Sequence, residues 1–509
     1  MRASLVIIML LIETLVNGQG FNKRYDAFGW EFGQTAFGIE RVEDGYLVIS
    51  GSDDYDSIAP GESFFHASVL LTRVNEAGVL LWEKRSWRPE HSAFAGWANC
   101  CDTIPGAGYI VGGSSEDTLG NDEIYLMRFD ANGDTLWTRV FGDPGLTYYW
   151  GGRQVKRTAD GGFLIVGDTQ TGGVDGFGLK TDSMGNEEWR RNYGWSTSQI
   201  DALLSSDHAP DDTYYMAGTR YLDDSNRDLW VQRTDTLGEV IWRVSWGGPY
   251  DDGSGHLTTL SDGNALIANA HGFSADGTMF KPALTKVDAT DGSIVWDRPY
   301  GPVTLNTVLF AAKETSGGDL IACGVSYYDG QQGLLLRTTA VGDSLWMRRY
   351  YYQDSLVTTG QGRFYDVLPT DDGGFIAAGA AYYPVSGPNP PGYSQDTWVV
   401  KVDGQGCIIP GCDAVGITEQ ATNLLGAITL FPNPAHDQVT VRLELPASAA
   451  GAALQLSLIA ADGRVVKQEI IANGAGSFIL SLANVSPGLY TVHITNGTTW
   501  LTGAKLVVE

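Results

Sequence analysis

One phrase recurs along the chain at nearly constant spacing, and it limits the possible folds more than any other feature. It reads DANGDTLW at 130–137, DSMGNEEW at 182–189 and DTLGEVIW at 235–242. Its tryptophan returns at intervals of 55, 52, 53, 54 and 50 residues, at Trp82, Trp137, Trp189, Trp242, Trp296 and Trp346. A fixed period of this kind predicts repeated structural units that stack to bury a shared core.

A second phrase precedes each tryptophan and gives the number of units. It runs DGYLVISG from Asp44, DGGFLIVG from Asp160 and DGGFIAAG from Asp372, with related segments at 106–113, 211–218, 262–269 and 317–324. Each unit holds four short β-compatible runs divided by turn residues. Four strands make one blade of a β-propeller, so the sequence predicts an all-β fold with a seven-bladed β-propeller.

The last unit stops at Cys407 without a tryptophan-bearing fourth strand. The segment FNKRYDAFG at 21–29 resembles the fourth-strand phrase WTRVFGDPG at 137–145, and it precedes the first strand of the first unit. We therefore expect the N-terminal strand to complete the last blade, which joins the chain ends and removes exposed sheet edges.

The repeated phrase itself is interpreted as a turn and a packing contact. Asp130 accepts hydrogen bonds from turn amides, Gly133 supplies a positive φ, and Trp137 fills space between blades. We expect no cofactor. Calcium is an alternative, since DANGD at 130–134 and the acids Asp53, Asp54 and Asp56 offer suitable oxygens, although the loop lacks the glycine and bidentate acid of an EF-hand.

Charge and the N-terminus indicate an exported protein. Residues 1–18 combine Arg2 with an apolar run at 5–12, which is typical of a signal peptide, and we expect no transmembrane segment after it. The formal net charge of −27 makes nucleic acid an unfavourable partner. In an exported chain with five cysteines, Cys407 and Cys412 are predicted to form a disulfide, whereas Cys323 is expected to be a buried thiol.

The remainder divides into three segments: a propeller at 19–412, a linker at 413–427, and a small Ig-like β-sandwich at 428–509. The final segment contains LFPNPAHDQVTV from Leu430, SPGLYTVHI from Ser486 and AKLVVE ending at Glu509. These motifs, in this order, resemble the type A C-terminal sorting domain of the type IX secretion system. The resemblance implies a sorting signal formed by Pro432, Asn433, Pro434, Gly488, Tyr490 and Lys505.

That resemblance implies a partner and a location. The partner is the type IX secretion machinery, and the product is secreted or attached to the outer-membrane surface after removal of the signal peptide and the sorting domain. The repeats are similar to β-propeller repeats of exported bacterial proteins. DATDGSIVW at 288–296 is similar to the tryptophan-docking repeat of pyrroloquinoline-quinone propellers, but this likeness covers the blades and not a cofactor site.

No nucleophile elbow, phosphate loop or HExxH motif is present. We therefore expect a monomeric binding or adhesion protein for a glycan or protein ligand, more readily than an enzyme. The alternative is a polysaccharide hydrolase or lyase with carboxylates at the propeller mouth. Long connections gather aromatics on one face, which predicts a binding surface of Trp87, Trp97, Tyr148, Tyr149, Trp150, Tyr350 and Tyr351.

Overall fold

The computed structural model confirms an all-β chain. It describes residues 20–26, 33–59, 62–86, 91–117, 122–142, 153–170, 174–195, 200–223, 226–274, 277–301, 306–327, 330–352, 360–385, 392–409, 418–419, 428–443, 454–460, 464–471, 476–496 and 499–509, and these contain strands but no α-helix. Accordingly, the described segments include no helix with the length and hydropathy needed to cross a membrane.

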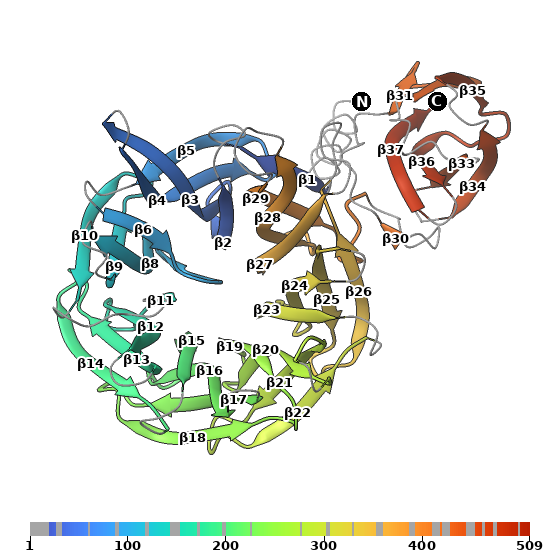
Figure 1. The fold of residues 1–509 in the computed structure, drawn as a ribbon. Helices are drawn as coiled ribbons and strands as arrows, with labels where there is room; N and C mark the ends of the chain where they lie inside the picture. Colours follow the sequence, from blue (N-terminus) through green and yellow to red (C-terminus); the bar gives the residue numbers. More distant parts are fainter. Residues whose placement is uncertain are drawn as a thin grey trace, which may run out of the picture.

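Seven sheets succeed one another in the described part of residues 21–402 and lie in a ring (Figure 1). The first holds β2 (Gln34–Val42), β3 (Gly45–Ala59), β4 (Glu62–Asn75) and β5 (Leu80–Ser86). The second holds β6 (His91–Ala95), β7 (Cys101–Ile104), β8 (Gly108–Asp117), β9 (Asp122–Phe129) and β10 (Thr135–Phe141). The third holds β11 (Gln154–Arg157), β12 (Phe163–Gln170), β13 (Val174–Thr181) and β14 (Glu187–Tyr193).

The remaining sheets continue the pattern. The fourth holds β15 (Asp201–His208), β16 (Tyr214–Asp223), β17 (Asn226–Thr234) and β18 (Val240–Trp246). The fifth holds β19 (Gly253–Thr259), β20 (Ala265–Gly272), β21 (Phe280–Val287) and β22 (Ile294–Pro299). The sixth holds β23 (Thr307–Glu314), β24 (Leu320–Ser326), β25 (Gln332–Thr338) and β26 (Ser344–Tyr350). The seventh holds β27 (Gln361–Pro369), β28 (Phe375–Val385), β29 (Gly392–Val402) and β1 (Phe21–Tyr25).

Each sheet is open, and its first strand lies towards the middle of the ring while its fourth lies at the rim (Figure 1). We call the first strands the inner strands. Neighbouring inner strands contact one another, as β15 does with β19, β19 with β23 and β23 with β27. Radial repetition of small antiparallel sheets is the arrangement of a β-propeller-like fold.

The predicted use of the N-terminal strand is confirmed. β1 pairs antiparallel with β29, with Phe21 opposite Lys401 and Tyr25 opposite Thr397. The side chain of Asn22 accepts a 2.5 Å hydrogen bond from Nε1 of the buried Trp398. The two ends of the repeat region are thus joined within one sheet.

The repeated phrase joins neighbouring sheets, as predicted. Asp130 accepts hydrogen bonds from the amides of Asn132 at 2.9 Å and Asp134 at 2.8 Å, and Gly133 has φ +80°. A Cβ added to Gly133 would lie 2.6 Å from a ring carbon of Trp82 in the preceding unit. The same contact recurs between Gly185 and Trp137, Gly238 and Trp189, Gly292 and Trp242, Gly342 and Trp296, and Gly406 and Trp346. Each glycine therefore leaves room for the tryptophan of the unit before it.

A tyrosine at the end of several outer strands adds a second contact between sheets. The hydroxyl of Tyr193 donates to the carbonyl of Gly238 at 2.8 Å, and Tyr25 in β1 donates to Gly78 at 2.8 Å. Tyr350 does the same to Gly406 at 2.6 Å, and its side chain is fully buried. The prediction that Tyr350 belongs to a solvent-facing binding surface is therefore wrong, because this tyrosine holds two sheets together.

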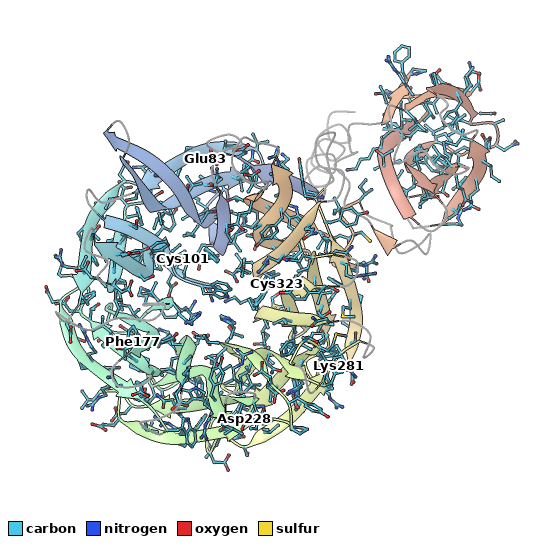
Figure 2. The ribbon with its side chains drawn as sticks, in the orientation of Figure 1. Glu83, Cys101, Phe177, Asp228, Lys281 and Cys323 are labelled. Atoms are coloured by element: carbon cyan, nitrogen blue, oxygen red, sulfur yellow. The ribbon has the colours of Figure 1, made fainter. Side chains whose placement is uncertain are left out.

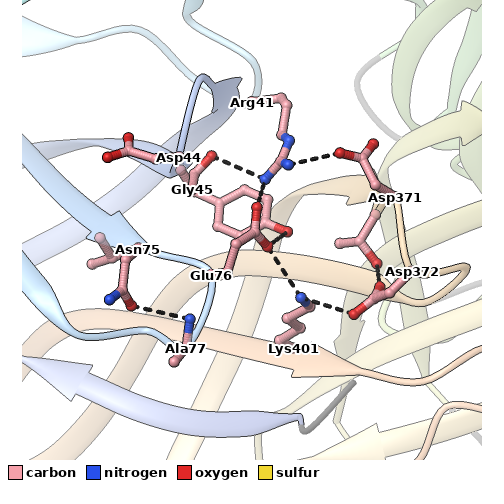
Figure 3. Close-up of polar contacts among 12 residues, drawn as sticks. Arg41, Asp44, Gly45, Asn75, Glu76, Ala77, Asp371, Asp372 and Lys401 are labelled. Carbon is pink, nitrogen blue, oxygen red and sulfur yellow. Dashed lines mark hydrogen bonds and ion pairs between the residues drawn. The ribbon is translucent and has the colours of Figure 1, made fainter. Parts of the chain in front are cut away.

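Charged groups reinforce the contact between the first and last sheets (Figure 3). The buried amine of Lys401 lies 3.2 Å from Glu76 and 3.0 Å from Asp372. Arg41 pairs with Glu76 and, at 2.7 Å, with Asp371. The pairs connect the turn after β4 with the turn after β27 and the strand β29, so they stabilise the closure of the ring.

The C-terminal segment forms two sheets around its own core. One sheet contains β31 (Ile428–Phe431), β32 (Gln438–Leu443) and β35 (Ser477–Ser481). The other contains β30 (Thr418–Glu419), β37 (Thr499–Val508), β36 (Gly488–Asn496), β33 (Leu454–Ala460) and β34 (Val465–Ile471). Alternating residues of both sheets, such as Val439, Val441, Leu456 and Leu458, are buried together.

The cysteines agree with the expectation as far as the structure describes them. Cys407 is disulfide-bonded, and its predicted partner Cys412 lies outside the described residues. Cys323 is a free, buried thiol, as are the adjacent Cys100 and Cys101.

Candidate functional site

An extra residue interrupts several inner strands at the same place in the repeat. The register shifts between Ala36 and Gly38 in β2, between Leu309 and Ala311 in β23, and between Phe364 and Asp366 in β27. The residues left without a partner are Phe37, Phe310 and Tyr365. A β-bulge turns its side chain away from the regular alternation, which is how a strand can present a residue outside its sheet.

The second sheet presents Trp97 in a related way. Its inner position is divided between β6 and β7, which both pair with β8, and residues 96–100 lie between them. Gly96 donates to the carbonyl of Gly112 at 3.0 Å, and Gly112 donates to Cys100 at 3.0 Å. Residues 96–100 therefore form a loop opposite Gly112, and Trp97 lies in this loop.

These aromatic side chains meet in what we call the axial aromatic cluster: Phe37, Trp97, Phe310 and Tyr365. The ring of Tyr365 lies 5.0 Å from Phe37, 5.2 Å from Trp97 and 5.2 Å from Phe310, measured between ring centroids. Tyr365 is buried, whereas the other three rings are partly exposed. Four consecutive sheets of the ring contribute one aromatic residue each to this cluster.

Arg363 borders the cluster two residues before Tyr365 in β27. Its Nη1 donates to the Tyr365 hydroxyl at 3.1 Å, and its Nη2 donates to Oε1 of Gln331 at 2.5 Å. The guanidinium also lies over the ring of Tyr382, at 5.0 Å from its centroid. Since Gln361 pairs with Tyr382 near the end of β28, this group lies towards the face that bears the long connections.

A second set of polar side chains occupies one position of the inner strands, next to the short turn. The strand register aligns Glu40, Asp102, Lys156, Asp207, Thr258, Lys313 and Leu368 in this position. Five of these seven residues are charged, although the strands around them are apolar. Figure 2 shows the neighbouring Cys101 on the inner side of its sheet.

Glu40 has the most perturbed carboxyl of this set. Burial among the inner strands raises the pKa of Glu40 to about 8. The charges of Asp102 and Asp366 also raise this pKa, whereas those of Lys156 and Lys313 lower it. A carboxyl with this pKa is largely protonated at neutral pH. Perturbed acids of this kind occur at functional sites and also in structural networks.

The aspartates at the inner strands are already engaged by the backbone. Asp102 accepts from the amides of Thr103 and, in the next sheet, Arg157, both at 2.8 Å. Asp366 accepts in the same way from its neighbour Val367 at 2.9 Å and from Ile39 of the first sheet at 3.1 Å. Their oxygens therefore hold adjacent inner strands together.

A histidine between two aspartates forms a separate group at the fifth sheet. Nδ1 of His271 lies 3.2 Å from Asp252, and its Nε2 lies 3.0 Å from Asp297. Burial lowers the pKa of His271, but the hydrogen bonds and charges of both aspartates outweigh it and raise that pKa to about 9. No sequence motif predicts this arrangement, because the three residues belong to different strands or loops.

The His271 group predicts a pH-dependent stability. Because the folded-state pKa is above the unfolded value of about 6.5, the stabilisation is complete below pH 6.5 and is lost as pH rises through about 9. We expect the wild type to lose about 1–3 kcal/mol more than His271→Gln between pH 6.5 and 9.5 in urea unfolding. Glu40 adds a similar pH dependence of the unfolding free energy to both proteins, so the comparison with His271→Gln removes it. Equal pH dependence of the two proteins would contradict the prediction.

The other predicted binding residues are placed only in part. Trp87, Tyr148, Tyr149 and Trp150 lie outside the described residues, as do the side chains of Asp53, Asp54 and Asp56. Tyr351 is partly exposed, and burial raises the pKa of its hydroxyl. The described residues contain no group of three or more His, Cys, Asp or Glu side chains able to hold a metal ion.

The predicted sorting motifs meet at the end of the C-terminal segment. The side chain of Asn433 donates to the carbonyl of Lys505 at 2.8 Å and accepts from the amide of Val507 at 2.9 Å. Tyr490 is buried, and its hydroxyl donates to Ser486 at 2.6 Å. Pro432, Pro434 and Gly488 are exposed. The Pro-Asn-Pro motif is thus bound to the last strand, β37.

Comparison with solved structures returns distant similarities. A puromycin hydrolase is 11% identical with a TM-score of 0.46, covering 91% of this chain and 58% of its own. A lectin from Burkholderia pseudomallei is 8% identical with a TM-score of 0.42, covering 68% of this chain and 94% of its own. A protein of unknown function from Dyadobacter fermentans is 8% identical with a TM-score of 0.40, covering 75% and 98%.

Comparison with sequence families gives a clear result for the C-terminal segment. No curated protein matches the chain. Residues 429–509 match the family described as "Secretion system C-terminal sorting domain". This match agrees with the motifs at Pro432 to Pro434, Gly488, Tyr490 and Lys505, and it confirms the predicted resemblance. The C-terminal segment of this chain is therefore a sorting domain of the type IX secretion system.

Proposed function

We propose that the chain is an exported binding protein that presents a seven-bladed β-propeller at or beyond the outer membrane. The propeller spans 19–412 after a signal peptide at 1–18, and a linker at 413–427 leads to an Ig-like sorting domain at 428–509. The seven successive sheets and the pairing of β1 with β29 support the propeller. The sorting domain supports secretion or surface attachment through the type IX machinery, with removal of both targeting segments.

The axial aromatic cluster is the observation that carries the binding function. Four sheets place Phe37, Trp97, Phe310 and Tyr365 within 5.7 Å of a neighbouring ring. Three of these rings keep partly exposed surfaces, and Arg363 and Gln331 supply polar groups beside them. Flat apolar faces bordered by hydrogen-bonding groups suit the two sides of a sugar ring. We propose that Trp87, Tyr148, Tyr149, Trp150 and Tyr351 extend this surface.

A hydrolase or lyase is the alternative, and the inner carboxyls favour it less. Glycoside chemistry needs two carboxyls free to act on a substrate. Asp102 and Asp366 accept hydrogen bonds from backbone amides, so their oxygens are already engaged. In the adjoining seventh sheet, Leu368 occupies the position equivalent to Glu40, so this position supplies no second carboxyl there. Binding without chemistry therefore accounts better for the arrangement.

Replacing Trp97 with alanine tests the proposed function. We expect the variant to lose about tenfold or more in affinity on a glycan array, because an aromatic face at the centre of a binding site contributes a large share of the binding energy. Trp97→Phe should retain part of the affinity. Leu237→Ala, in an exposed turn on the opposite face, serves as control and should bind normally.

The circular dichroism spectrum and melting temperature of each variant show whether the fold is kept. If Trp97→Ala binds as the wild type does, or if all ligands are lost only together with the fold, the cluster is a structural contact. In that case the proposed binding site is wrong.

A further inference from the structure

We propose that Arg363 recognises a carboxylate, so that the glycan bound at the axial aromatic cluster ends in a uronic acid. This inference rests on the proposed binding function and specifies its ligand.

The side chain of Arg363 is held by neutral partners. Tyr365 and Gln331 accept hydrogen bonds from Nη1 and Nη2, and the ring of Tyr382 covers one face of the guanidinium. Nε is buried and has no hydrogen-bond partner among the described residues. The two hydrogen bonds and the covering ring fix the guanidinium before any ligand arrives.

No acidic side chain of the described segments lies within ion-pair distance of Arg363. Comparable arginines of the ring have such partners: Arg337 pairs with Asp319 at 2.7 Å, and Arg153 pairs with the buried Asp168 at 2.7 Å. Although burial lowers the pKa of Arg363, the surrounding tyrosines raise it overall, so the group is charged. A fixed, partly exposed cation that has no counter-charge among the described residues is suited to an anionic ligand.

The shape of the group favours a carboxylate. A guanidinium is planar, and when one face rests on an aromatic ring its edge presents parallel N–H groups that match the two oxygens of a carboxylate. Tyr365 connects this edge to the aromatic rings, since its hydroxyl accepts from Arg363 while its ring contacts Phe37, Trp97 and Phe310. A sugar stacked on the cluster would place a carboxylate substituent beside the guanidinium.

The charge of the protein limits the ligand further. With a formal net charge of −27, the chain repels an extended polyanion such as an acidic peptide or a fully charged polysaccharide. A single carboxylate at the end of a glycan meets Arg363 directly and carries little additional charge. The structure therefore favours a uronic-acid end over a polyanionic chain.

Matched sugar pairs test this inference on the full chain. Methyl glucuronide and methyl glucoside, methyl galacturonide and methyl galactoside, and methyl mannuronide and methyl mannoside differ within each pair only in the carboxylate. Binding is measured by tryptophan fluorescence and saturation-transfer NMR. We expect at least one uronide to bind about tenfold more tightly than its neutral partner, because hydrogen bonds to charged groups are strong.

Variants of Arg363 identify the source of the preference. Arg363→Gln should bring the ratio within each pair close to one by weakening the acidic sugar more than the neutral one, and Arg363→Lys should keep part of the ratio. Trp97→Ala should weaken both members of each pair. Leu237→Ala, in an exposed turn of the ring, serves as control for folding and should retain the preference.

The outcomes separate this inference from the proposed function. If neutral and acidic sugars bind equally, or if Arg363→Gln leaves the preference unchanged, the carboxylate assignment is wrong while the glycan site stands. If no sugar of any pair binds, both are wrong. Displacement of a bound uronide by a glutamate-rich peptide or by a sulfated sugar at lower concentration than by the free uronide would also overturn the assignment.

Discussion

Replacing Arg24 with alanine is expected to lower the free energy of unfolding by about 3–5 kcal/mol, because it removes an ion-pair partner of a buried carboxylate. Arg24 in β1 lies 2.5 Å from Asp396, whose side chain is fully buried. Burial lowers the pKa of the Arg24 guanidinium, but Asp396 outweighs this effect and raises it. Urea unfolding of the purified protein measures the change.

Arg41→Ala is the matched control for this prediction. Arg41 also joins the first and last sheets, but its partners Glu76 and Asp371 are 36% and 84% exposed, so we expect a loss of less than about 1 kcal/mol. Deleting Phe21–Asp26 should destabilise the ring more than either substitution. The deletion also removes the hydrogen bond between Asn22 and Trp398 and the packing of the Phe21 ring against Gly78. Equal effects of Arg24→Ala and Arg41→Ala would contradict the role of β1 in closing the ring.

Removing Thr429–Glu509 is expected to abolish delivery to the cell surface while leaving the ring folded. The C-terminal segment has its own core, with Val441, Leu456 and Val492 fully buried within it, so its loss should not expose the core of the ring. Fractionation and protease treatment of intact cells should find the truncated protein inside the envelope. Circular dichroism and the melting temperature of the purified truncation show whether the ring is intact.

A single substitution refines the same prediction. Asn433→Ala removes both hydrogen bonds that join the Pro-Asn-Pro motif to β37, so we expect it to reduce surface delivery substantially. Leu237→Ala, in a turn of the ring, should be delivered normally and is the control. Surface exposure of the truncated chain at wild-type levels would show that the sorting domain does not direct export.

The sequence predicted most of the features that depend on local chemistry or on repetition. The aspartate, glycine and tryptophan of the repeated phrase behave as expected at Asp130, Gly133 and Trp137, because a turn with positive φ has narrow residue requirements. The pairing of β1 with β29 followed from the missing fourth strand of the last unit. The sorting domain could be identified because its motifs are contiguous and ordered.

The candidate site was predicted less completely. The sequence predicts both Trp97 and Tyr350 as exposed aromatics; Trp97 lies in the axial aromatic cluster, whereas Tyr350 is buried. The sequence contained a signal for the burial of Tyr350, because this residue aligns with Tyr193 and Tyr300, which make the same contact between sheets. Alignment of the inner strands would likewise have shown the charged position of Glu40, Asp102 and Lys156.

The sequence by itself determined the repeat, the strands, the turns and the export signal, because each depends on residues within one unit or one motif. Only the tertiary structure decided that Phe37, Phe310 and Tyr365 meet, since β-bulges on three separate sheets turn them together. It also decided which arginine has an acidic partner and which, like Arg363, has none among the described residues. Such contacts join residues hundreds of positions apart and form only because the ring of sheets closes. A local sequence pattern does not predict the curvature that closes this ring.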